Sequence, residues 1–205
     1  IGNKRACSFG DISTTSFFPA KPLGCYGDGG AVFTDNDEWA ALADSYRVHG
    51  KGMFKYDNVR IGMNSRLDTL QAAILKIKFK AFREYELRDI NKAAALYTGK
   101  LSGKVKTPVV PEGYYSSWAQ YTIRLDSKEE RDALQTRLKE QGIPSMVYYP
   151  TPMHGQTAYK TLNISDDCCP TAKQLCDTVL SLPVHPYITE EEIETVCSVI
   201  LGFVR

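Results

Sequence analysis

The residues best suited to chemistry lie in a lysine-bearing turn near the start of the chain, which reads S-F-F-P-A-K-P-L-G over residues 16–24. Prolines at Pro19 and Pro22 flank Lys21, and proline both excludes helix and restricts the backbone. The lysine amine is therefore held at a fixed place, where it could form an imine with a carbonyl compound. The hydroxyl of Ser16 lies where it could approach an anion. By composition alone, a solvated turn lysine is the favoured interpretation.

Glycines follow the lysine turn at Gly27, Gly29 and Gly30. They allow the backbone to approach a ligand closely, but they are just as natural in a hairpin turn. A second glycine-containing segment, from His49 to Met63, is too long to be a simple connection, which favours a functional role.

Two strands and a helix are expected to hold these loops. The β-favouring run over residues 12–18 ends at a proline and predicts a buried strand, and residues 31–34 predict a second strand. Asp35, with a glutamate three residues later, predicts a helix that runs to about Val48.

The most regular pattern in the chain predicts a long helix. Ser65 and Asp68 have the spacing of a capping box, and an apolar stripe continues from there toward Leu96. A helix of about 30 residues is long enough to link two domains.

The second half follows a linker rich in glycine and proline over residues 99–113. Its alternating strand and helix patterns are typical of a compact α/β unit with its own core. The expected elements are a strand over 120–125, a helix over 128–141 opened by Ser127 and Glu130, a strand over 146–149, a helix starting near Pro170, and a last helix capped by Thr189 and Glu192.

Composition points to a soluble globular protein. The chain has 205 residues, 43% hydrophobic and 24% charged, which suits one large domain or two small ones. A net charge of +1 provides no field that would gather nucleic acid or an anionic membrane. No apolar run approaches the roughly 20 residues that span a bilayer, and no signal peptide is visible. The six cysteines show no C-x-x-C pair and no zinc-ligand spacing, which favours free thiols in a reducing cytosol and predicts no metal site.

Several strings of residues occur in an order that resembles one known family. They are T-T-S-F-F-P-A-K-P-L-G-C-Y-G-D-G-G-A-V-F-T, Y-R-V-H-G, I-G-M-N-S-R-L-D-T-L-Q-A-A-I-L, W-A-Q-Y-T-I, G-I-P-S-M-V-Y-Y-P-T-P-M-H and S-L-P-V-H-P-Y, and together they extend over essentially the whole chain. The chain resembles the DegT/DnrJ/EryC1/StrS sugar aminotransferases, which are fold-type I pyridoxal phosphate enzymes. Within this family it looks most like the enzymes that aminate the 3-keto group of a UDP-linked N-acetylhexosaminuronic acid in O-antigen synthesis.

The resemblance assigns roles to three residues at the cofactor. Lys21 matches the catalytic lysine that forms the internal Schiff base with pyridoxal 5'-phosphate, and Ser16 matches the serine that hydrogen-bonds the cofactor phosphate. Asn64 matches an asparagine that reaches across a dimer interface to the phosphate bound by the neighbouring subunit. A place at the start of the long helix would suit that role, and a simple helix cap is the alternative.

Four further residues are implied in substrate binding. Arg47 and His49 would contact the substrate or its diphosphate, with a solvated surface pair as the alternative. Tyr149 and His154 would belong to the nucleotide-sugar site. His185 is expected to be packed at a domain boundary instead.

The resemblance also implies the fold. It predicts an α/β chain that forms the C-terminal part of a fold-type I pyridoxal-phosphate-dependent transferase. Residues 1–75 would be a remnant of the cofactor-binding large domain with the end of its mixed sheet. Residues 76–104 would be the linking helix and linker, and residues 105–205 the small C-terminal α/β domain.

The implied activity is ping-pong transamination from glutamate to a keto group of the nucleotide sugar, in a cytoplasmic homodimer with a shared active site. The first half of family members supplies an aspartate for the pyridine nitrogen and an aromatic ring that stacks on the cofactor. Since this chain lacks that half, we expect the isolated chain to be a poor enzyme. The alternative is a non-catalytic fragment that acts as an assembly or nucleotide-sugar binding module.

Overall fold

The structure is a computed structural model that describes residues 1–204, and it divides into two compact units. The N-terminal unit comprises Ile1–Tyr85 and Pro111–Tyr115, and the C-terminal unit comprises Glu86–Val110 and the chain from Ser116 onward. Each unit is described by itself below. The functional division expected from the sequence, at residues 75 and 104, stays a prediction.

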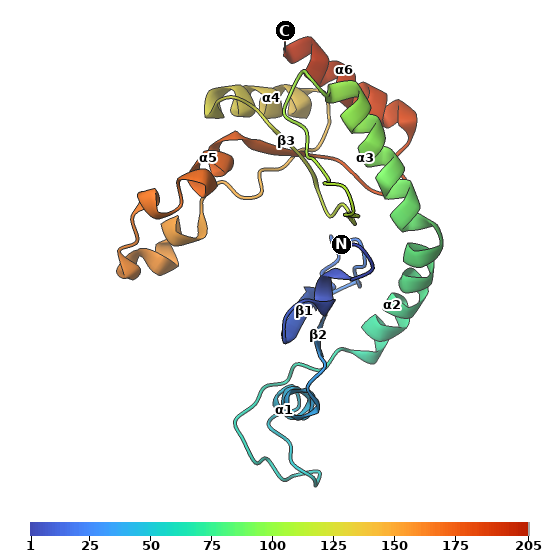
Figure 1. Cartoon of the computed structure of the whole chain (residues 1–205), viewed down its shortest axis with the longest axis vertical. Coiled ribbons are helices and arrows are strands. Elements are labelled where there is room, and N and C mark those ends of the chain that lie inside the picture. Colours follow the sequence, from blue (N-terminus) through green and yellow to red (C-terminus); the bar gives the residue numbers. More distant parts are fainter. Residues whose placement is uncertain (205) are drawn as a thin grey trace. The chain divides into compact units, whose positions relative to one another are not determined.

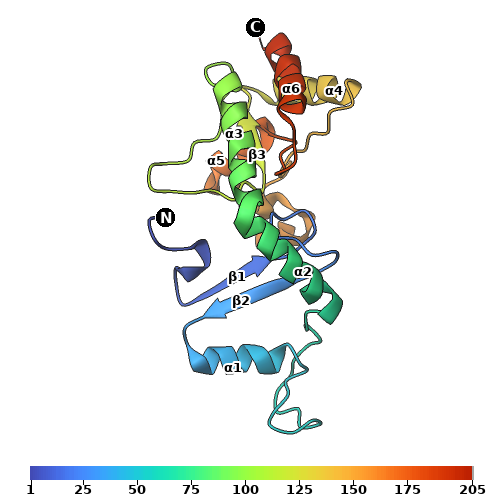
Figure 2. The ribbon, with the colours of Figure 1, turned by 90° about the vertical axis from the view of Figure 1, so that its right-hand side faces the viewer.

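A β-hairpin organises the N-terminal unit. After a short 3₁₀ helix, η1 (Ala6–Ser8), strand β1 (Ile12–Ser16) pairs antiparallel with β2 (Gly30–Thr34) (Figure 2). The two predicted strands are therefore present. The prediction that the first is buried is wrong, because side chains along β1 alternate between exposed and half-buried, as in a sheet covered on one face.

Helix α1 (Asp37–Tyr46) packs against β2. Its N-cap is Asn36, whose side-chain oxygen accepts a hydrogen bond of 3.0 Å from the backbone N–H of Trp39. The helix therefore begins one residue later than the pattern at Asp35 predicts, since asparagine satisfies the free N–H as well as aspartate does.

The long helical segment is continuous along the chain (Figure 1). It consists of α2 (Thr69–Ala81), a π-helical turn, η2 (Phe82–Glu86), and α3 (Leu87–Leu101). The predicted capping box is wrong. Asp68 occupies the N-cap position but its side chain makes no capping hydrogen bond, and the backbone N–H of Ser65 donates to the carbonyl of Arg47 instead.

The C-terminal unit combines a two-stranded sheet with helices. Strand β3 (Tyr121–Arg124) pairs antiparallel with β4 (Val179–Leu182), which the sequence analysis missed. The predicted strand over 146–149 is wrong, since it reduces to a single bridge between Met146 and Ser181. The remaining elements are α4 (Lys128–Glu140), η3 (Met153–Gly155), η4 (Thr157–Leu162), η5 (Asp166–Cys168), α5 (Pro170–Thr178) and α6 (Glu190–Phe203).

Helix ends in this unit follow the sequence closely. The hydroxyl of Ser127 accepts from the backbone N–H of Glu130 at 3.1 Å, and Pro170 is the first residue of α5. Thr189 and Glu192 form the predicted reciprocal capping box at the start of α6. These predictions are confirmed, because capping and proline effects are local.

A single hydrophobic core holds the C-terminal unit together, which confirms the predicted α/β unit with its own core. Side chains from α3, β3, α4, β4 and α6 meet there, and Tyr97, Tyr121, Leu134 and Ile193 are fully buried in it. The rings of Tyr97 and Tyr121 stack with centroids 5.0 Å apart. Among the described residues, no helix is both long and apolar enough to cross a membrane.

Candidate functional site

The predicted reactive lysine lies in the loop that joins β1 to β2. We call residues 16–29, which include the last residue of β1, the lysine loop. Its base is closed by two backbone hydrogen bonds of 2.8 Å, from Phe17 N–H to the carbonyl of Gly29 and from Cys25 N–H to the carbonyl of Phe17. A third, from Lys21 N–H to the carbonyl of Phe18, closes the tight turn that carries the lysine. The backbone around the amine is thus fixed by its own hydrogen bonds.

Close packing inside the loop explains two of its small residues. A Cβ atom on Gly24 would lie 2.6 Å from the carbonyl oxygen of Pro19, so only glycine fits there. The side chain of Cys25 is fully buried, and its thiol lies 3.0 Å from the carbonyl oxygens of both Phe17 and Gly27. Cys25 therefore serves as a small, weakly polar filler at the centre of the loop.

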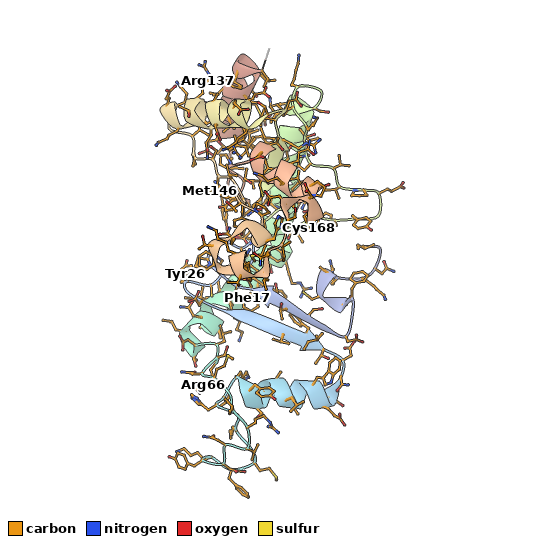
Figure 3. All side chains as sticks on the ribbon, turned by 90° about the vertical axis from the view of Figure 1, so that its left-hand side faces the viewer. Phe17, Tyr26, Arg66, Arg137, Met146 and Cys168 are labelled. Atoms are coloured by element: carbon orange, nitrogen blue, oxygen red, sulfur yellow. The ribbon has the colours of Figure 1, made fainter. Side chains whose placement is uncertain are left out.

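Helix α2 anchors the lysine loop through Gln71, a residue that the sequence analysis did not single out. The backbone N–H of Tyr26 donates to Gln71 Oε1 at 2.7 Å, and a Cβ on Gly27 would lie 3.1 Å from Gln71 Nε2. Figure 3 shows Tyr26 and Phe17 near the same end of the hairpin. A polar glutamine among the apolar residues of L-Q-A-A-I-L was the signal that could have found it.

The two predicted cofactor residues on this loop differ in their surroundings. Lys21 is exposed, and its amine has no hydrogen-bond or ion-pair partner within residues 1–204. The hydroxyl oxygen of Ser16 accepts from the backbone N–H of Phe18 at 3.1 Å, which leaves the hydroxyl proton available to donate. A free amine and a free donor therefore lie on the same closed loop.

A second strip of backbone brings three other predicted residues together. The segment around Val48 runs antiparallel to the segment around Asn64: His49 N–H donates to the carbonyl of Met63, and Ser65 N–H donates to that of Arg47, both at 2.9 Å. Arg47, His49 and Asn64 thus become neighbours. Asn64 lies in this ladder, ahead of Thr69, and not at the start of the helix as predicted.

Arg47 and His49 are constrained in different ways. Arg47 Nε donates to Asp44 Oδ1 at 2.8 Å, and the two half-exposed side chains form an ion pair of the kind that is worth about 0–1 kcal/mol. His49 has a φ of 60°, in the left-handed region that non-glycine residues rarely adopt. Next to it, a Cβ on Gly50 would lie 1.8 Å from the carbonyl oxygen of Arg60, so the backbone segments at Gly50 and Arg60 pack too closely for any side chain at position 50.

A cleft of about 1210 Å³ lies within the N-terminal unit. Its walls come from the hairpin, from α1 and from residues 64–68, and they include Arg47 and Asn64. Neither Lys21 nor Ser16 lines it. The structure therefore places Lys21 and Ser16 in the lysine loop and Arg47 and Asn64 in the cleft, while His49 pairs with Met63 without lining the cleft.

The other predicted residues belong to the C-terminal unit. Tyr149 is exposed, and its ring meets that of Tyr148 edge to face at 5.6 Å. His154 is nearly buried, with 10% of its side chain exposed, and its Nε2 lies 3.2 Å from Asp166 Oδ1. His185 is exposed and lies in the turn before α6, where its carbonyl accepts from Ile188 N–H. Its packing at a domain boundary stays a prediction.

Comparison with known proteins shows the family of the chain. The model of the DegT/DnrJ/EryC1/StrS aminotransferase family matches residues 1–201. The chain belongs to this family. Both the resemblance drawn from the sequence strings and the predicted fold class are thereby confirmed, since solved aminotransferases of the family share the α/β arrangement over about half of their length.

Two curated relatives show the range of the family. The chain is 41% identical over 198 residues to the UDP-2-acetamido-2-deoxy-3-oxo-D-glucuronate aminotransferase of Pseudomonas aeruginosa, covering 95% of this chain and 52% of the relative. It is 34% identical to the dTDP-3-amino-3,4,6-trideoxy-alpha-D-glucose transaminase of Streptomyces venezuelae, covering 90% of this chain and 48% of the relative. The chain thus spans about half the length of the relatives it matches.

Solved aminotransferase structures resemble the fold of this chain. A DegT/DnrJ/EryC1/StrS aminotransferase from Brucella abortus superposes with a TM-score of 0.90 at 46% identity, over 96% of this chain and 52% of that one. NtdA from Bacillus subtilis, solved with bound pyridoxamine phosphate (PMP), superposes with a TM-score of 0.86 at 27% identity, over 98% and 47%.

Proposed function

We propose that the protein containing this chain is a pyridoxal-phosphate-dependent aminotransferase that moves an amino group from glutamate to a keto group of a nucleotide-linked sugar. The observation that carries the proposal is the lysine loop: a chain of this family holds an exposed, unpartnered amine at Lys21 on a backbone fixed by three hydrogen bonds. An amine that must form and exchange a covalent bond needs this combination of fixed position and free nitrogen.

The residues of the loop fit pyridoxal 5'-phosphate. When bound, this cofactor supplies the electron sink for breaking the bond between the donor carbon and its proton. In our proposal Lys21 Nζ holds the cofactor covalently and, once released, accepts that proton and returns it. Ser16 Oγ keeps a proton that it can donate to a phosphate oxygen, because its only contact in the loop is as an acceptor.

Asn64 would supply a second donor to a phosphate. Its backbone is fixed against Val48, and the residue is exposed beside the cleft. We propose that its amide reaches the phosphate held by a second copy of the chain, so that the active sites are shared in a homodimer. This proposal explains why an amide donor lies in a cleft that does not contain Lys21.

Substrate binding would fall to Arg47, His49, Tyr149 and His154. The guanidinium of Arg47 can exchange its weak surface pair with Asp44 for a diphosphate, which accepts two parallel hydrogen bonds from arginine. The strained backbone at His49 is of the kind that clusters at binding sites. Tyr149 and His154 would contact the nucleotide sugar from the C-terminal unit.

The sugar that we propose is a UDP-linked 3-keto-N-acetylhexosaminuronic acid, used in cell-surface polysaccharide synthesis in the cytoplasm. The name of the Pseudomonas aeruginosa relative supports UDP and the uronic acid. The Streptomyces venezuelae relative is named for a dTDP sugar, so the nucleotide is the part of the proposal that most needs a test. Because relatives are about twice as long, we propose that activity requires further sequence that corresponds to their remaining half.

The test uses the protein expressed from its whole reading frame, with glutamate and matched UDP- and dTDP-linked 3-keto sugars. We expect glutamate-dependent amination with a higher kcat/KM for the UDP sugar. Lys21→Arg should lower kcat by at least about 10³-fold, since it removes both the covalent anchor and the proton carrier. Lys76→Arg, at an exposed position of α2, is the matched control and should retain activity. Turnover that is unaffected by Lys21→Arg would contradict the proposal, and cofactor-free sugar binding would favour the binding module.

A further inference from the structure

A cluster of metal-ligating side chains in the C-terminal unit is unrelated to the lysine loop. His154, Cys168 and Cys169 each offer one ligand atom, and these atoms all lie within 4.8 Å of one another. We call these three residues the thiol–imidazole cluster. The spacing of the cysteines along the chain predicts no metal site, because this cluster forms only where two separate segments of the chain meet.

Short helical turns bring the ligands together. His154 lies in η3, Cys168 ends η5, and Cys169 is the N-cap residue of α5. Cys168 is among the side chains labelled in Figure 3. Both cysteines are exposed, so an ion could reach the thiols from solvent.

The donor set is specific in its chemistry. Two thiols and one imidazole match the ligands that Zn²⁺ and other thiophilic divalent cations prefer, and three protein ligands leave the fourth tetrahedral position to water. Two thiolates also balance the charge of a divalent ion. Binding would release the two thiol protons to the solvent.

The histidine is held in the way that metal-binding histidines usually are. Its Nε2 lies 3.2 Å from Asp166 Oδ1, and its side chain is only 10% exposed. Such a carboxylate fixes the tautomer and the orientation of the ring.

We propose that His154, Cys168 and Cys169 bind one thiophilic divalent cation of the Zn²⁺ or Cd²⁺ type, with Asp166 as the positioning residue for the imidazole. His154 is also proposed above for the nucleotide-sugar site, and a bound ion would occupy its ring. The other four cysteines take no part in the cluster.

The direct test is equilibrium binding of Zn²⁺ to the whole chain kept under a reductant, with bound metal measured after dialysis. We expect one equivalent of Zn²⁺ per chain. Titration with Cd²⁺ should produce the ultraviolet charge-transfer band of thiolate ligation in the unaltered protein, which identifies sulfur ligands without any substitution. Absence of stoichiometric Zn²⁺, or absence of that band, would overturn the proposal. No cofactor or sugar is involved, so the result is independent of the proposed aminotransferase activity.

Substitutions locate the site. Cys168→Ser and Cys169→Ser should each weaken Zn²⁺ binding by more than the about 10–100-fold that loss of an outer partner produces, and Asp166→Asn should weaken it within that range. Cys7→Ser, a thiol in the N-terminal unit, should have no effect. Because Cys168 and Cys169 are exposed, their variants should unfold at the same temperature as the parent metal-free chain. Full binding by the Cys168→Ser/Cys169→Ser double variant would overturn the assignment.

Discussion

The two units of this chain are built in opposite ways. In the C-terminal unit, apolar side chains from three helices and two strands close around one core. In the N-terminal unit, Cys25 and Leu75 are the buried apolar side chains among the residues that the structure describes, while large apolar side chains such as Met53, Phe54 and Ile61 are at least 73% exposed. The unit with the predicted reactive lysine is therefore the one with almost no core.

Backbone contacts take the place of a core in the N-terminal unit. Its loops are held by hydrogen bonds, by close approaches at Gly24 and Gly50, and by Gln71. Large exposed apolar surface usually marks contact with other protein. This contrast supports our proposal that the N-terminal unit meets a second copy of the chain and further sequence.

The sharpest test of the contrast is the same substitution in both units. Leu134→Ala, in the core of the C-terminal unit, should lower the free energy of unfolding of that unit by about 2–5 kcal/mol, because it removes buried apolar surface and leaves a cavity. Leu70→Ala, at a position of α2 that is 69% exposed, should change stability by no more than about 0.5 kcal/mol in the same chain.

Tryptophan fluorescence can separate the units in this measurement. The chain has two tryptophans, with Trp39 in the N-terminal unit and Trp118 in the C-terminal unit against Tyr121. In a Trp39→Phe background, denaturant unfolding followed by Trp118 fluorescence reports the C-terminal unit and the effect of Leu134→Ala. In a Trp118→Phe background, Trp39 fluorescence reports the N-terminal unit and the effect of Leu70→Ala. Equal destabilisation by the two leucine substitutions would show that the contrast between the units is wrong.

A smaller effect should appear at alkaline pH. Burial raises the pKa of the Cys197 thiol from 9.0 to about 11, and burial also raises the pKa of Tyr97. Between pH 9 and 11 the unfolded chain loses the thiol proton while the folded unit keeps it, so stability falls as pH rises. We expect a loss of about 1–3 kcal/mol across this window in the C-terminal unit.

Replacement of the thiol isolates its contribution. Cys197→Ala should flatten the decline between pH 9 and 10, where the thiol contributes more than Tyr97, although the variant is less stable at neutral pH. Cys7→Ala, in the N-terminal unit, should leave the decline unchanged. A Cys197→Ala variant with the parent slope would assign the effect to another group.

The smallest effect concerns the anchor of the lysine loop. Gln71→Leu removes the acceptor for Tyr26 N–H, which should cost about 0.5–1.5 kcal/mol and speed hydrogen exchange at that amide. In the active protein it should lower kcat more than it changes the KM for the sugar, because Lys21 is less well fixed. Gln71→Glu keeps an acceptor and should restore slow exchange; equally fast exchange in both variants would exclude a role for this contact.

Local signals in the sequence predicted most elements and their ends. Ser127, Thr189 and Pro170 act within one helical turn, so their effects are visible in a single segment. The Ser65–Asp68 box failed because the backbone of residues 63–65 pairs with residues 47–49, a contact between distant segments. Strand β4 was missed because V-L-S-L is short and lies directly behind a helical pattern, and its strand state depends on pairing with β3.

The candidate site, like the secondary structure, was predictable only where local sequence carries the signal. The lysine turn could be found from its prolines and from the family resemblance, since both are written along the chain. Gln71, the neighbourhood of Arg47 and Asn64, and the thiol–imidazole cluster depend on tertiary contacts that no local pattern contains. The sequence therefore did not predict Gln71 or the thiol–imidazole cluster, and it did not predict that Arg47 and Asn64 would lie together.

The most direct test of the account is covalent trapping of pyridoxal 5'-phosphate by borohydride in the protein expressed from its whole reading frame, followed by mass mapping of peptides. We predict one reduced adduct, on the peptide that contains Lys21, and its loss in Lys21→Arg but not in Lys76→Arg. A protein without an adduct at Lys21, or with label spread evenly over exposed lysines, would contradict the claim that this amine holds the cofactor.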